Sequence, residues 1–268
     1  MKVAAVAFAL GALLWCQGAT AVVRVPRFEH VIVIVFENKE AGSVIGNREA
    51  PTFNAYFRRY AAMTRYYGVT HPSLPNYLAL VSGATQGITS DCTACTVRAR
   101  SLADTLEAAG LGWKTYAEGY PSSARYAKKH NPFLYFRGVD RSRVVPLTEL
   151  SPDLAGGKLP DFSLVVPDLC NSMHDCPVED GDDWLRRIAP PLLKFQRTAI
   201  FVIFDEGTTS VRGGGHTAAL VIGTAVRPGA RYVRPANHYS VLRTIETAWG
   251  LPLLGHSAAV SPITGIWR

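Results

Sequence analysis

The chain has 268 residues, of which 48% are hydrophobic and 18% are charged, with 23 Gly and 17 Pro. These proportions exclude a disordered, collagen-like or low-complexity protein, and the length fits one large α/β domain or two small ones. The formal net charge of +7 favours anionic partners in general, but it does not distinguish nucleic acid, membrane or phosphorylated substrates.

The N-terminal segment predicts a cleaved secretory signal peptide. Lys2 precedes an apolar run over residues 3–15, and small residues follow it up to Ala21, where we expect cleavage. The run is too short to span a bilayer. A lipoprotein signal at Cys16 is the alternative, but Trp15 fits poorly before a lipidated cysteine. We therefore expect residues 22–268 to be periplasmic or secreted, without a transmembrane segment.

Four cysteines remain after that cleavage, Cys92, Cys95, Cys170 and Cys176. Because disulfides persist in exported proteins, the spacings C-x-x-C and C-x5-C favour two local bridges, Cys92–Cys95 and Cys170–Cys176. A four-cysteine zinc site is the alternative. The second loop encloses His174 and Asp175, so a bridge there would hold both side chains in a fixed loop.

Four continuous apolar runs predict strands of a mostly parallel sheet, covered by helices on both faces. They are residues 30–36, 162–166, 199–204 and 218–222. Helical patterns lie at residues 52–66, 76–81, 101–109, 183–195, with a break at Pro190 and Pro191, and 239–249. We expect Asn237 to cap the last helix, Arg243 and Glu246 to lie on its exposed side, and residues 120–160 to form a surface excursion. This α/β pattern predicts ligand binding beyond the carboxyl ends of the strands.

Oxygen-bearing side chains follow three of these strands. They are Glu37 with Asn38, Asp168 after Pro167, and Asp205 with Glu206. Carboxylates brought to one edge of a sheet repel one another, so a cation must bind them or some must stay protonated. Oxygen ligands fit Mg, Ca or Mn, and an added imidazole would favour Zn or Fe. For any single pair, an ordinary polar loop is the simpler interpretation.

The segment HPSLPNYLALVSG, residues 71–83, holds the candidate nucleophile. Pro72 and Pro75 restrict the backbone around Ser73, and a short helix is expected to follow. Ser73 would then lie at a helix N-terminus, where free amides and the helix dipole favour an anion. A metal-activated hydroxyl there could attack phosphorus, and Asn76 could bind the same phosphate. A serine that merely caps the helix is the alternative.

Histidines are the candidates for proton transfer, because their ordinary pKa suits protonation of a leaving alkoxide. We rank His174 first and His216 second as catalytic groups; His71 and His238 are candidates for substrate binding. His216 follows three glycines, residues 213–215, which permit close approach of the backbone.

Several segments, taken together and in order, resemble the bacterial phosphoesterase family. They are VIVIVFENKEAGSVIGN, THPSLPNYLALVSG, DEG, GGGHTAALVIG and NHYSVLRTIETAWGLPLLG. That family groups secreted acid phosphatases, phosphatidylinositol phosphatases and phospholipase C enzymes, and it is similar in fold to alkaline phosphatase. The resemblance implies a three-layer αβα sandwich and a single phosphoesterase domain over residues 22–268.

The resemblance also implies roles for individual residues. The SLPN segment is similar to TFPN in nucleotide pyrophosphatase/phosphodiesterases, which makes Ser73 the nucleophile and Asn76 a phosphate contact. By the same resemblance the ligands of one divalent metal are Glu37, Asn38, Ser73, Asp205 and Glu206. Two-zinc relatives have Asp after the first strand and Asp-His after the later one, so this chain departs from their pattern. Asp168 and His174 resemble the Asp-x3-His pair of a second metal site, but they lie six residues apart.

The expected function is therefore that of a metal-dependent phosphomonoesterase, acting through phosphoserine on a small phosphate ester or phospholipid headgroup. A phosphodiesterase or phospholipase C on the same fold is the nearest alternative. A secreted anion- or metal-binding protein without activity is another. Nucleic-acid binding is disfavoured because the basic residues are scattered, and doublets such as Lys128-Lys129 are expected to be solvated surface.

Overall fold

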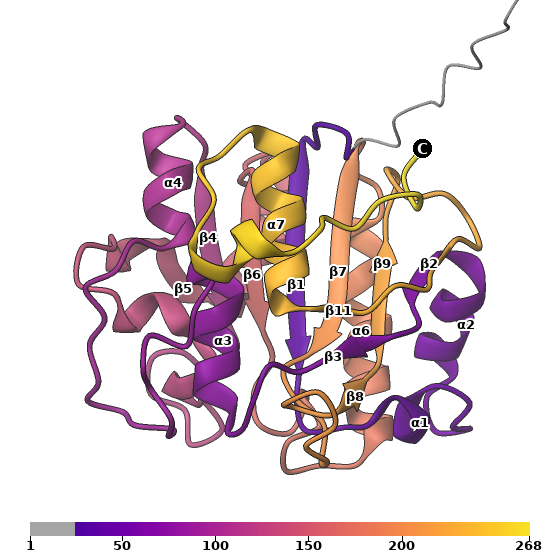
Figure 1. Ribbon diagram of the computed structural model, residues 1–268. Helices are drawn as coiled ribbons and strands as arrows, with labels where there is room; N and C mark the ends of the chain where they lie inside the picture. Colours follow the sequence, from indigo (N-terminus) through magenta and orange to yellow (C-terminus); the bar gives the residue numbers. More distant parts are fainter. Residues whose placement is uncertain (1–24) are drawn as a thin grey trace, which may run out of the picture.

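The computed structural model describes residues 25–268, so the predicted signal peptide and Cys16 lie outside the described residues. Its centre is an eight-stranded sheet in the order β10-β2-β9-β7-β1-β6-β4-β5 (Figure 1). The strands are β1 His30–Phe36, β2 Ala61–Met63, β4 Trp113–Ala117, β5 Val144–Pro146, β6 Phe162–Val166, β7 Thr198–Phe204, β9 Ala219–Ile222 and β10 Arg231–Tyr232. The neighbours pair in parallel except at β9, which runs antiparallel to β7 and β2.

A second, three-stranded sheet has the order β11-β3-β8. Its strands are β3 Tyr66–Tyr67, β8 His216–Thr217 and β11 Ala236–Asn237. The helices are α1 Ala41–Val44, α2 Pro51–Arg59, α3 Ser73–Ser82, α4 Leu102–Ala108, α5 Leu150–Ala155, α6 Val178–Leu192 and α7 His238–Trp249. Short 3-10 turns are η1 Lys128–His130, η2 Pro132–Tyr135, η3 Arg141–Arg143, η4 Leu147–Glu149 and η5 Gly255–Ala259.

Helices cover both faces of the large sheet, which confirms the predicted α/β layers. Along β1, Val31, Val33 and Val35 pack into a core that includes side chains of α3, α4 and α7. The alternate residues Ile32 and Ile34 pack into a second core with side chains of α2 and α6. Figure 1 shows α7 in front of the sheet and α6 behind it. Burial on both faces explains why β1 is continuously apolar.

All four predicted strands are confirmed. The helix expected over residues 52–66 ends at Arg59, so that prediction is wrong for the residues that follow. Residues 61–63 form β2 instead, because their backbone pairs with β9 and β10, and this pairing overrides the helical preference of two alanines. The expected break at Pro190 and Pro191 is also wrong. Both lie in the last turn of α6, which continues through them to Leu192, so only hydrogen bonds at the very end of the helix are lost.

Two expectations about exposure are wrong as well. Residues 120–160 supply the edge strand β5 and carry the buried His130, so they are more than a surface excursion. Glu246 is fully buried, because the segment around Ser257 folds over α7 and hydrogen-bonds to it. The predicted cap is confirmed: Asn237 accepts a hydrogen bond from the amide of Tyr239.

Both predicted disulfides are present, Cys92–Cys95 and Cys170–Cys176. They use all four thiols, which overturns the alternative of a four-cysteine zinc site. Over residues 25–268, no helix is long and apolar enough to cross a membrane.

Candidate functional site

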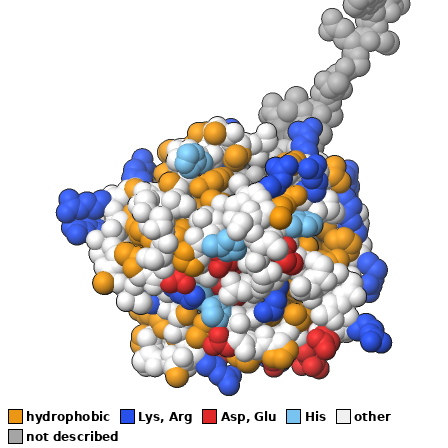
Figure 2. Space-filling view, turned by 60° about the horizontal axis from the view of Figure 1, so that its bottom comes forward, with side chains coloured by type: hydrophobic (Ala, Val, Ile, Leu, Met, Phe, Trp, Pro, Cys, Tyr) orange, Lys and Arg blue, Asp and Glu red, His pale blue; other side chains and the backbone are white. Residues whose placement is uncertain are grey.

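The candidate site lies where β1 and β7 end, at the bottom of the view in Figure 1. Phe36 and Phe204 are paired residues at the ends of these parallel strands, so Glu37 and Asp205 follow side by side. The amide of Asp205 donates to the carbonyl of Phe36 at 2.9 Å, and Asp205 Oδ1 accepts from the amide of Asn38 at 3.3 Å. Figure 2 shows histidine and acidic side chains gathered on this face of the molecule.

Ser73 is the first residue of α3 and is almost fully buried. Pro72 occupies the N-cap position, so Ser73 does not cap the helix. Its hydroxyl instead donates toward two carboxylates, Glu37 Oε2 at 3.2 Å and Glu206 Oε1 at 3.3 Å. The structure therefore joins the ends of two strands to a helix N-terminus through one hydroxyl, and the interpretation of Ser73 as a capping serine is wrong.

Burial dominates the electrostatics of these carboxyl groups. Burial raises the pKa of Glu37 well above its usual value, and the charge of Asp205 raises it further. The pKa of Asp205 is also raised by burial, although hydrogen bonds oppose the shift. Burial and the charge of Asp205 raise the pKa of Glu206 to about 7, against the opposing effect of His71. Three carboxyl groups thus share a region that disfavours their combined negative charge.

One oxygen in this cluster has no partner among the described residues. Asp205 Oδ2 is buried and accepts no hydrogen bond, while Oδ1 accepts from the amides of Asn38 and Glu206. An orphaned buried carboxylate oxygen is costly unless a further group binds it. Oxygen donors of this kind suit a hard divalent cation, so the residues present fit the metal that the sequence predicts.

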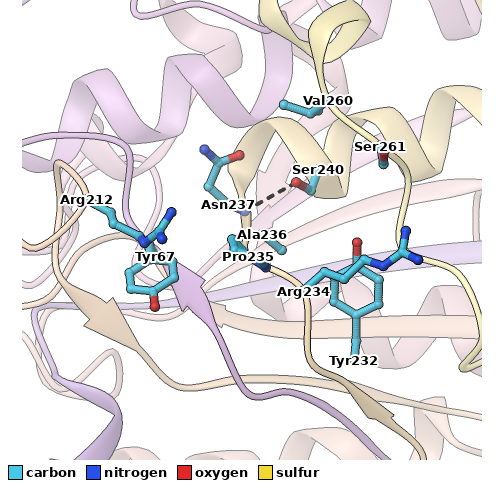
Figure 3. Close-up of a pocket in the computed structure, with 10 residues that line it drawn as sticks. All are labelled: Tyr67, Arg212, Tyr232, Arg234, Pro235, Ala236, Asn237, Ser240, Val260 and Ser261. Atoms are coloured by element: carbon cyan, nitrogen blue, oxygen red, sulfur yellow. Dashed lines mark hydrogen bonds between the residues drawn. The ribbon is translucent and has the colours of Figure 1, made fainter.

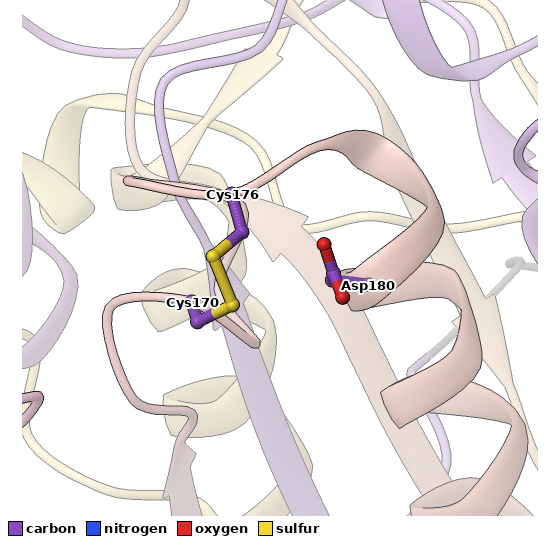
Figure 4. A group of neighbouring side chains, drawn as sticks. All are labelled: Cys170, Cys176 and Asp180. Carbon is purple, nitrogen blue, oxygen red and sulfur yellow. A yellow bond between two sulfur atoms is a disulfide. The ribbon is translucent and has the colours of Figure 1, made fainter.

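A tighter group of metal-binding residue types lies elsewhere. Cys170, Cys176 and Asp180 have ligand atoms within 4.8 Å of one another, and over residues 25–268 no other such trio of His, Cys, Asp or Glu is that compact. Figure 4 shows Asp180 beside the bonded sulfurs. The two sulfurs are bonded to each other and provide no thiolate, so this group is a disulfide beside an exposed carboxylate. Thiolate is the form of cysteine that binds metal.

His130, which the sequence analysis missed, lies in the centre of the site. Its ring is buried and stacks on Tyr77 at 5.3 Å between centroids, and its Nε2 lies 3.4 Å from Glu37 Oε2. The Tyr77 hydroxyl donates to the other oxygen of Glu37. Burial lowers the pKa of His130 well below its usual value, and the neighbouring charge of Lys129 lowers it further. His130 is therefore neutral at physiological pH.

Lys129 and His174 lie beside His130. The Lys129 ammonium is 2.8 Å from Asp91 Oδ2 and 3.3 Å from His174 Nε2. The rings of His130 and His174 are 5.7 Å apart, and His174 Nδ1 lies 2.5 Å from Asp175 Oδ1. Lys129 is thus partly buried in an ion pair, so the expectation that its doublet is solvated surface is wrong for this residue. The structure brings His174 to the edge of the site, in the loop closed by the Cys170–Cys176 disulfide.

His71 contacts the carboxylate cluster through Glu206. Its Nδ1 is 2.7 Å from Glu206 Oε2, and its Nε2 is 3.0 Å from the carbonyl of Thr209. Burial lowers the pKa of His71, but the bond to Thr209 and the charge of Glu206 outweigh that effect, so the pKa is raised. His71 therefore balances the charge of Glu206 and fixes its orientation.

Asn76 holds the turn that precedes Ser73. Its Oδ1 accepts from the amides of Val69 at 2.8 Å and Thr70 at 3.1 Å, and its Nδ2 donates to the carbonyl of Thr70 at 2.7 Å. A further contact to Glu206 Oε2 measures 3.4 Å. The side chain is committed to the protein backbone, so in this structure Asn76 positions Ser73.

Three other predicted residues bind backbone groups rather than the carboxylates of the cluster. His238 is buried between the Tyr66 hydroxyl at 2.8 Å and the backbone carbonyl of Asp205 at 2.6 Å. Burial lowers its pKa to about 4, although the bond to that carbonyl opposes the shift. His238 therefore supports the backbone beneath the site as a neutral ring.

His216 and Asp168 likewise bind backbone groups. His216 Nε2 is 3.0 Å from the carbonyl of Thr64. Asp168 Oδ1 accepts from the amides of Cys170 at 2.9 Å and Asn171 at 2.8 Å, which shapes the disulfide loop. Within residues 25–268, no hydrogen bond or ion pair joins either side chain to Ser73, so the structure does not bring them into the cluster.

Close backbone approach near the glycines is confirmed. A Cβ at Gly213 would lie 2.1 Å from the carbonyl oxygen of Val69, and one at Gly207 would lie 2.4 Å from Glu40 Oε1. That Glu40 oxygen accepts from the amides of Thr208 and Thr209 at 3.0 Å. The glycines thus allow the loop after β7 to pack against the turn that leads to Ser73.

Two hollows flank this region of the surface. One, with a volume of about 350 Å³, is drawn in Figure 3, where Arg212 and Arg234 stand on opposite sides of the α7 N-terminus. None of the residues that line it belongs to the carboxylate cluster. The other, of about 740 Å³, is lined partly by Asp91, Lys129 and His174, and therefore opens beside the site.

Comparison with known proteins gives the family of this chain. The profile of the phosphoesterase family matches residues 44–252. The chain belongs to this phosphoesterase family. It is 35% identical over 253 residues to the phosphatidylinositol-3-phosphatase of Mycobacterium tuberculosis, a match that covers 90% of this chain and 84% of the relative. These matches identify a hydrolase of phosphoric ester bonds.

More distant relatives extend the phosphoesterase similarity. An acid phosphatase of Aspergillus fumigatus is 29% identical over 220 residues, covering 72% of this chain and 49% of the relative, so the chain spans about half of that protein. A solved alkaline phosphatase superfamily protein from Vibrio parahaemolyticus matches with a TM-score of 0.62 at 17% identity, covering 87% of this chain and 70% of that one. That likeness shows that the two proteins share a fold.

Proposed function

We propose that this phosphoesterase is an exported, metal-dependent phosphomonoesterase that forms a phosphoserine at Ser73. The observation that carries the proposal is the position of the Ser73 hydroxyl, buried at the N-terminus of α3 and facing Glu37 and Glu206. Amides at a helix N-terminus favour the phosphoryl oxygens of a substrate.

The metal would be held by the oxygen-bearing side chains of the cluster, Glu37, Asn38, Ser73, Asp205 and Glu206. The orphaned Oδ2 of Asp205 and the raised pKa values of the three carboxyl groups support a cation there. When bound, a divalent cation would neutralise the carboxylates and the phosphoryl oxygens and would favour the serine alkoxide.

Ser73 Oγ then attacks phosphorus in line, and the bond from phosphorus to the ester oxygen breaks. The serine proton passes to the carboxylates that the hydroxyl already faces, while protonated His174 donates a proton to the leaving alkoxide. In the second step water attacks the phosphoserine and gives a proton to His174. The bond from phosphorus to Oγ breaks, and Ser73 regains its proton. Neutral His130, in the centre of the site, and charged Lys129 beside it bind phosphoryl oxygens.

The substrate would be a small phosphate ester or a phospholipid headgroup. A relative named phosphatidylinositol-3-phosphatase supports the second class, and relatives named acid phosphatases support the first. The two disulfides fit an oxidising compartment, which supports a periplasmic or secreted location for a single phosphoesterase domain over residues 22–268.

A substrate panel on residues 22–268 tests the proposal. We expect turnover of p-nitrophenyl phosphate above that of bis-p-nitrophenyl phosphate, with loss of activity in chelator and recovery with added divalent metal. Ser73→Ala should lower kcat by at least about 1,000-fold, because the nucleophile is removed. An acid quench should trap a phosphoryl group on Ser73 in the parent protein and none in the variant.

Faster turnover of the diester would replace the monoesterase with a phosphodiesterase. Full activity of Ser73→Ala would exclude the phosphoserine. Retained metal without turnover of any ester would indicate a binding protein.

A further inference from the structure

The hollow of about 740 Å³ beside the site has two chemically different sets of lining residues. The part near Ser73 includes the polar lining residues Asp91, Lys129 and His174. Aromatic and aliphatic side chains also line the hollow: Tyr120, Tyr126, Leu134 and Leu169. Its volume is within the range of pockets that bind small organic ligands.

Contacts on the protein side show how close this hollow lies to the nucleophile. Asp91 Oδ1 accepts from the amide of Leu74, the residue after Ser73, at 2.9 Å. Asp91 also pairs with Lys129, whose ammonium lies 3.3 Å from His174. The polar part is therefore separated from the Ser73 hydroxyl by a single residue of α3. A phosphate ester in line for attack by Ser73, before its alcohol leaves, would have the leaving oxygen toward His174, and the rest of the alcohol would extend into the hollow.

The polar groups that line the hollow already have partners. Lys129 pairs with Asp91, and His174 pairs with Asp175. The Lys128 ammonium donates to the carbonyl of Thr93 at 2.6 Å. Beyond the roles of Lys129 and His174 at the phosphoryl group and the leaving oxygen, the charged lining residues are already paired within the protein and need no charged partner on the alcohol.

The aromatic and aliphatic lining residues of the hollow offer apolar surface to a ligand. The rings of Tyr120 and Tyr126 meet edge to face, with centroids 5.4 Å apart. Both are half-buried, as are Leu134 and Leu169, so apolar surface remains accessible from the hollow. An aromatic guest can add a further edge-to-face or offset contact to such a pair.

We propose that this hollow holds the alcohol part of the substrate and selects phosphate esters whose leaving group carries an aromatic ring. The inference rests on the proposed function, because it takes Ser73 as the point where the ester is cleaved. It names Tyr120 and Leu134 as specificity-determining residues that act through contact with the ring.

The test compares phenyl phosphate with ethyl phosphate in the same preparation of the full mature chain. Tyr120→Ala and Leu134→Ala should lower kcat/KM for phenyl phosphate by about 3- to 10-fold, mainly through KM, and leave ethyl phosphate nearly unchanged. The ratio of the two kcat/KM values does not depend on how much of each variant is folded. Leu154→Ala is the matched control, because Leu154 lines a separate hollow beside α5 and α6.

An unchanged ratio in both pocket variants would overturn the pocket assignment, as would an equal change in Leu154→Ala. A second measurement, the Kd of phenylphosphonate against ethylphosphonate, needs no turnover. Suppose that the protein cleaves no ester but binds phenylphosphonate more tightly than ethylphosphonate, and that Tyr120→Ala removes this preference. That result would support the pocket and refute the proposed function. Turnover that depends on Ser73 but shows no preference for an aromatic leaving group would support the proposed function and refute the pocket assignment.

Discussion

Two regions of the molecule bury carboxyl groups, and they treat them differently. On α6, Asp182 accepts from the amides of Phe53 at 2.8 Å and Thr52 at 3.0 Å, and on α7, Glu246 accepts from Leu254 and Ser257. Each of their carboxylate oxygens has a hydrogen-bond donor. At the ends of β1 and β7, by contrast, Asp205 has one oxygen with no partner and lies beside Glu37, another buried acid.

We interpret the difference as one between carboxyl groups that stabilise the fold and carboxyl groups that would bind a cation under the proposed function. Asp182 joins α6 to the N-terminus of α2, where its charge also suits the helix dipole. Asp205 Oδ1 accepts hydrogen bonds from two backbone amides, whereas Oδ2 accepts none. A buried acceptor without a donor costs free energy that a bound cation would recover.

The largest expected effect comes from Asp205→Asn, which tests this contrast directly. We expect kcat to fall by about 1,000-fold or more, because removal of one charged ligand weakens both metal binding and charge neutralisation. A divalent cation should raise the Tm of the parent protein and leave the Tm of the variant unchanged. In chelator the variant should be at least as stable as the parent, since a buried charge has been removed.

Asp182→Asn is the matched control for that experiment. It should lower stability by about 1 to 3 kcal/mol, because an acceptor for two buried amides becomes an amide group. The rise in Tm on addition of metal should persist. If Asp205→Asn instead destabilises the protein in chelator and keeps the metal-dependent rise, Asp205 is a structural carboxylate like Asp182.

Histidines show the same contrast on a smaller scale. His216 is bonded to the backbone of Thr64, whereas His174 lies at the rim of the site beside Lys129. His174→Asn should lower kcat for an alkyl phosphate by about 100-fold, with a smaller loss for p-nitrophenyl phosphate, whose leaving anion needs no proton. His216→Asn should change either rate by less than about 3-fold. A larger loss in His216→Asn would reassign the general acid to that residue.

The strands and the carboxylates at their ends could be predicted because burial on both faces leaves a continuous apolar run in the sequence. The runs at β1 and β7 end at Glu37 and Asp205, and parallel pairing then makes these residues neighbours. The position of Ser73 followed from Pro72, which fixes the start of α3. These features are local in the sequence, or follow from strand order.

The remaining site residues depend on contacts between distant segments. His130 follows two lysines in a Pro- and Arg-rich segment, and nothing in that pattern shows that η1 packs against α3 and directs the ring to Glu37. Strand β4 (WKTYA) mixes polar and apolar residues, and the edge strand β5 (VVP) has only 3 residues, so neither carries a long apolar run. The only local signal for His130 was a histidine beside Asn131-Pro132, where a proline fixes the next turn.

Glu246 provides the smallest and most specific test, because its burial was missed in the sequence. Burial raises the pKa of Glu246 to about 7, although bonds from Ser257 and Leu254 oppose the shift. The folded state therefore binds this proton more tightly than the unfolded chain, so the contribution of Glu246 to stability is complete below about pH 4.5 and is lost as the pH rises through 7. Glu246→Gln mimics the protonated form, so it should gain stability relative to the parent over that range, on the order of 2 kcal/mol, with unchanged kcat.

Urea unfolding at several pH values measures the difference in the free energy of unfolding between variant and parent. The exposed Glu49→Gln is the control and should show no such difference. A constant difference across pH would mean that the hydrogen bonds to Glu246 cancel the effect of its desolvation, so that folding leaves its pKa unchanged.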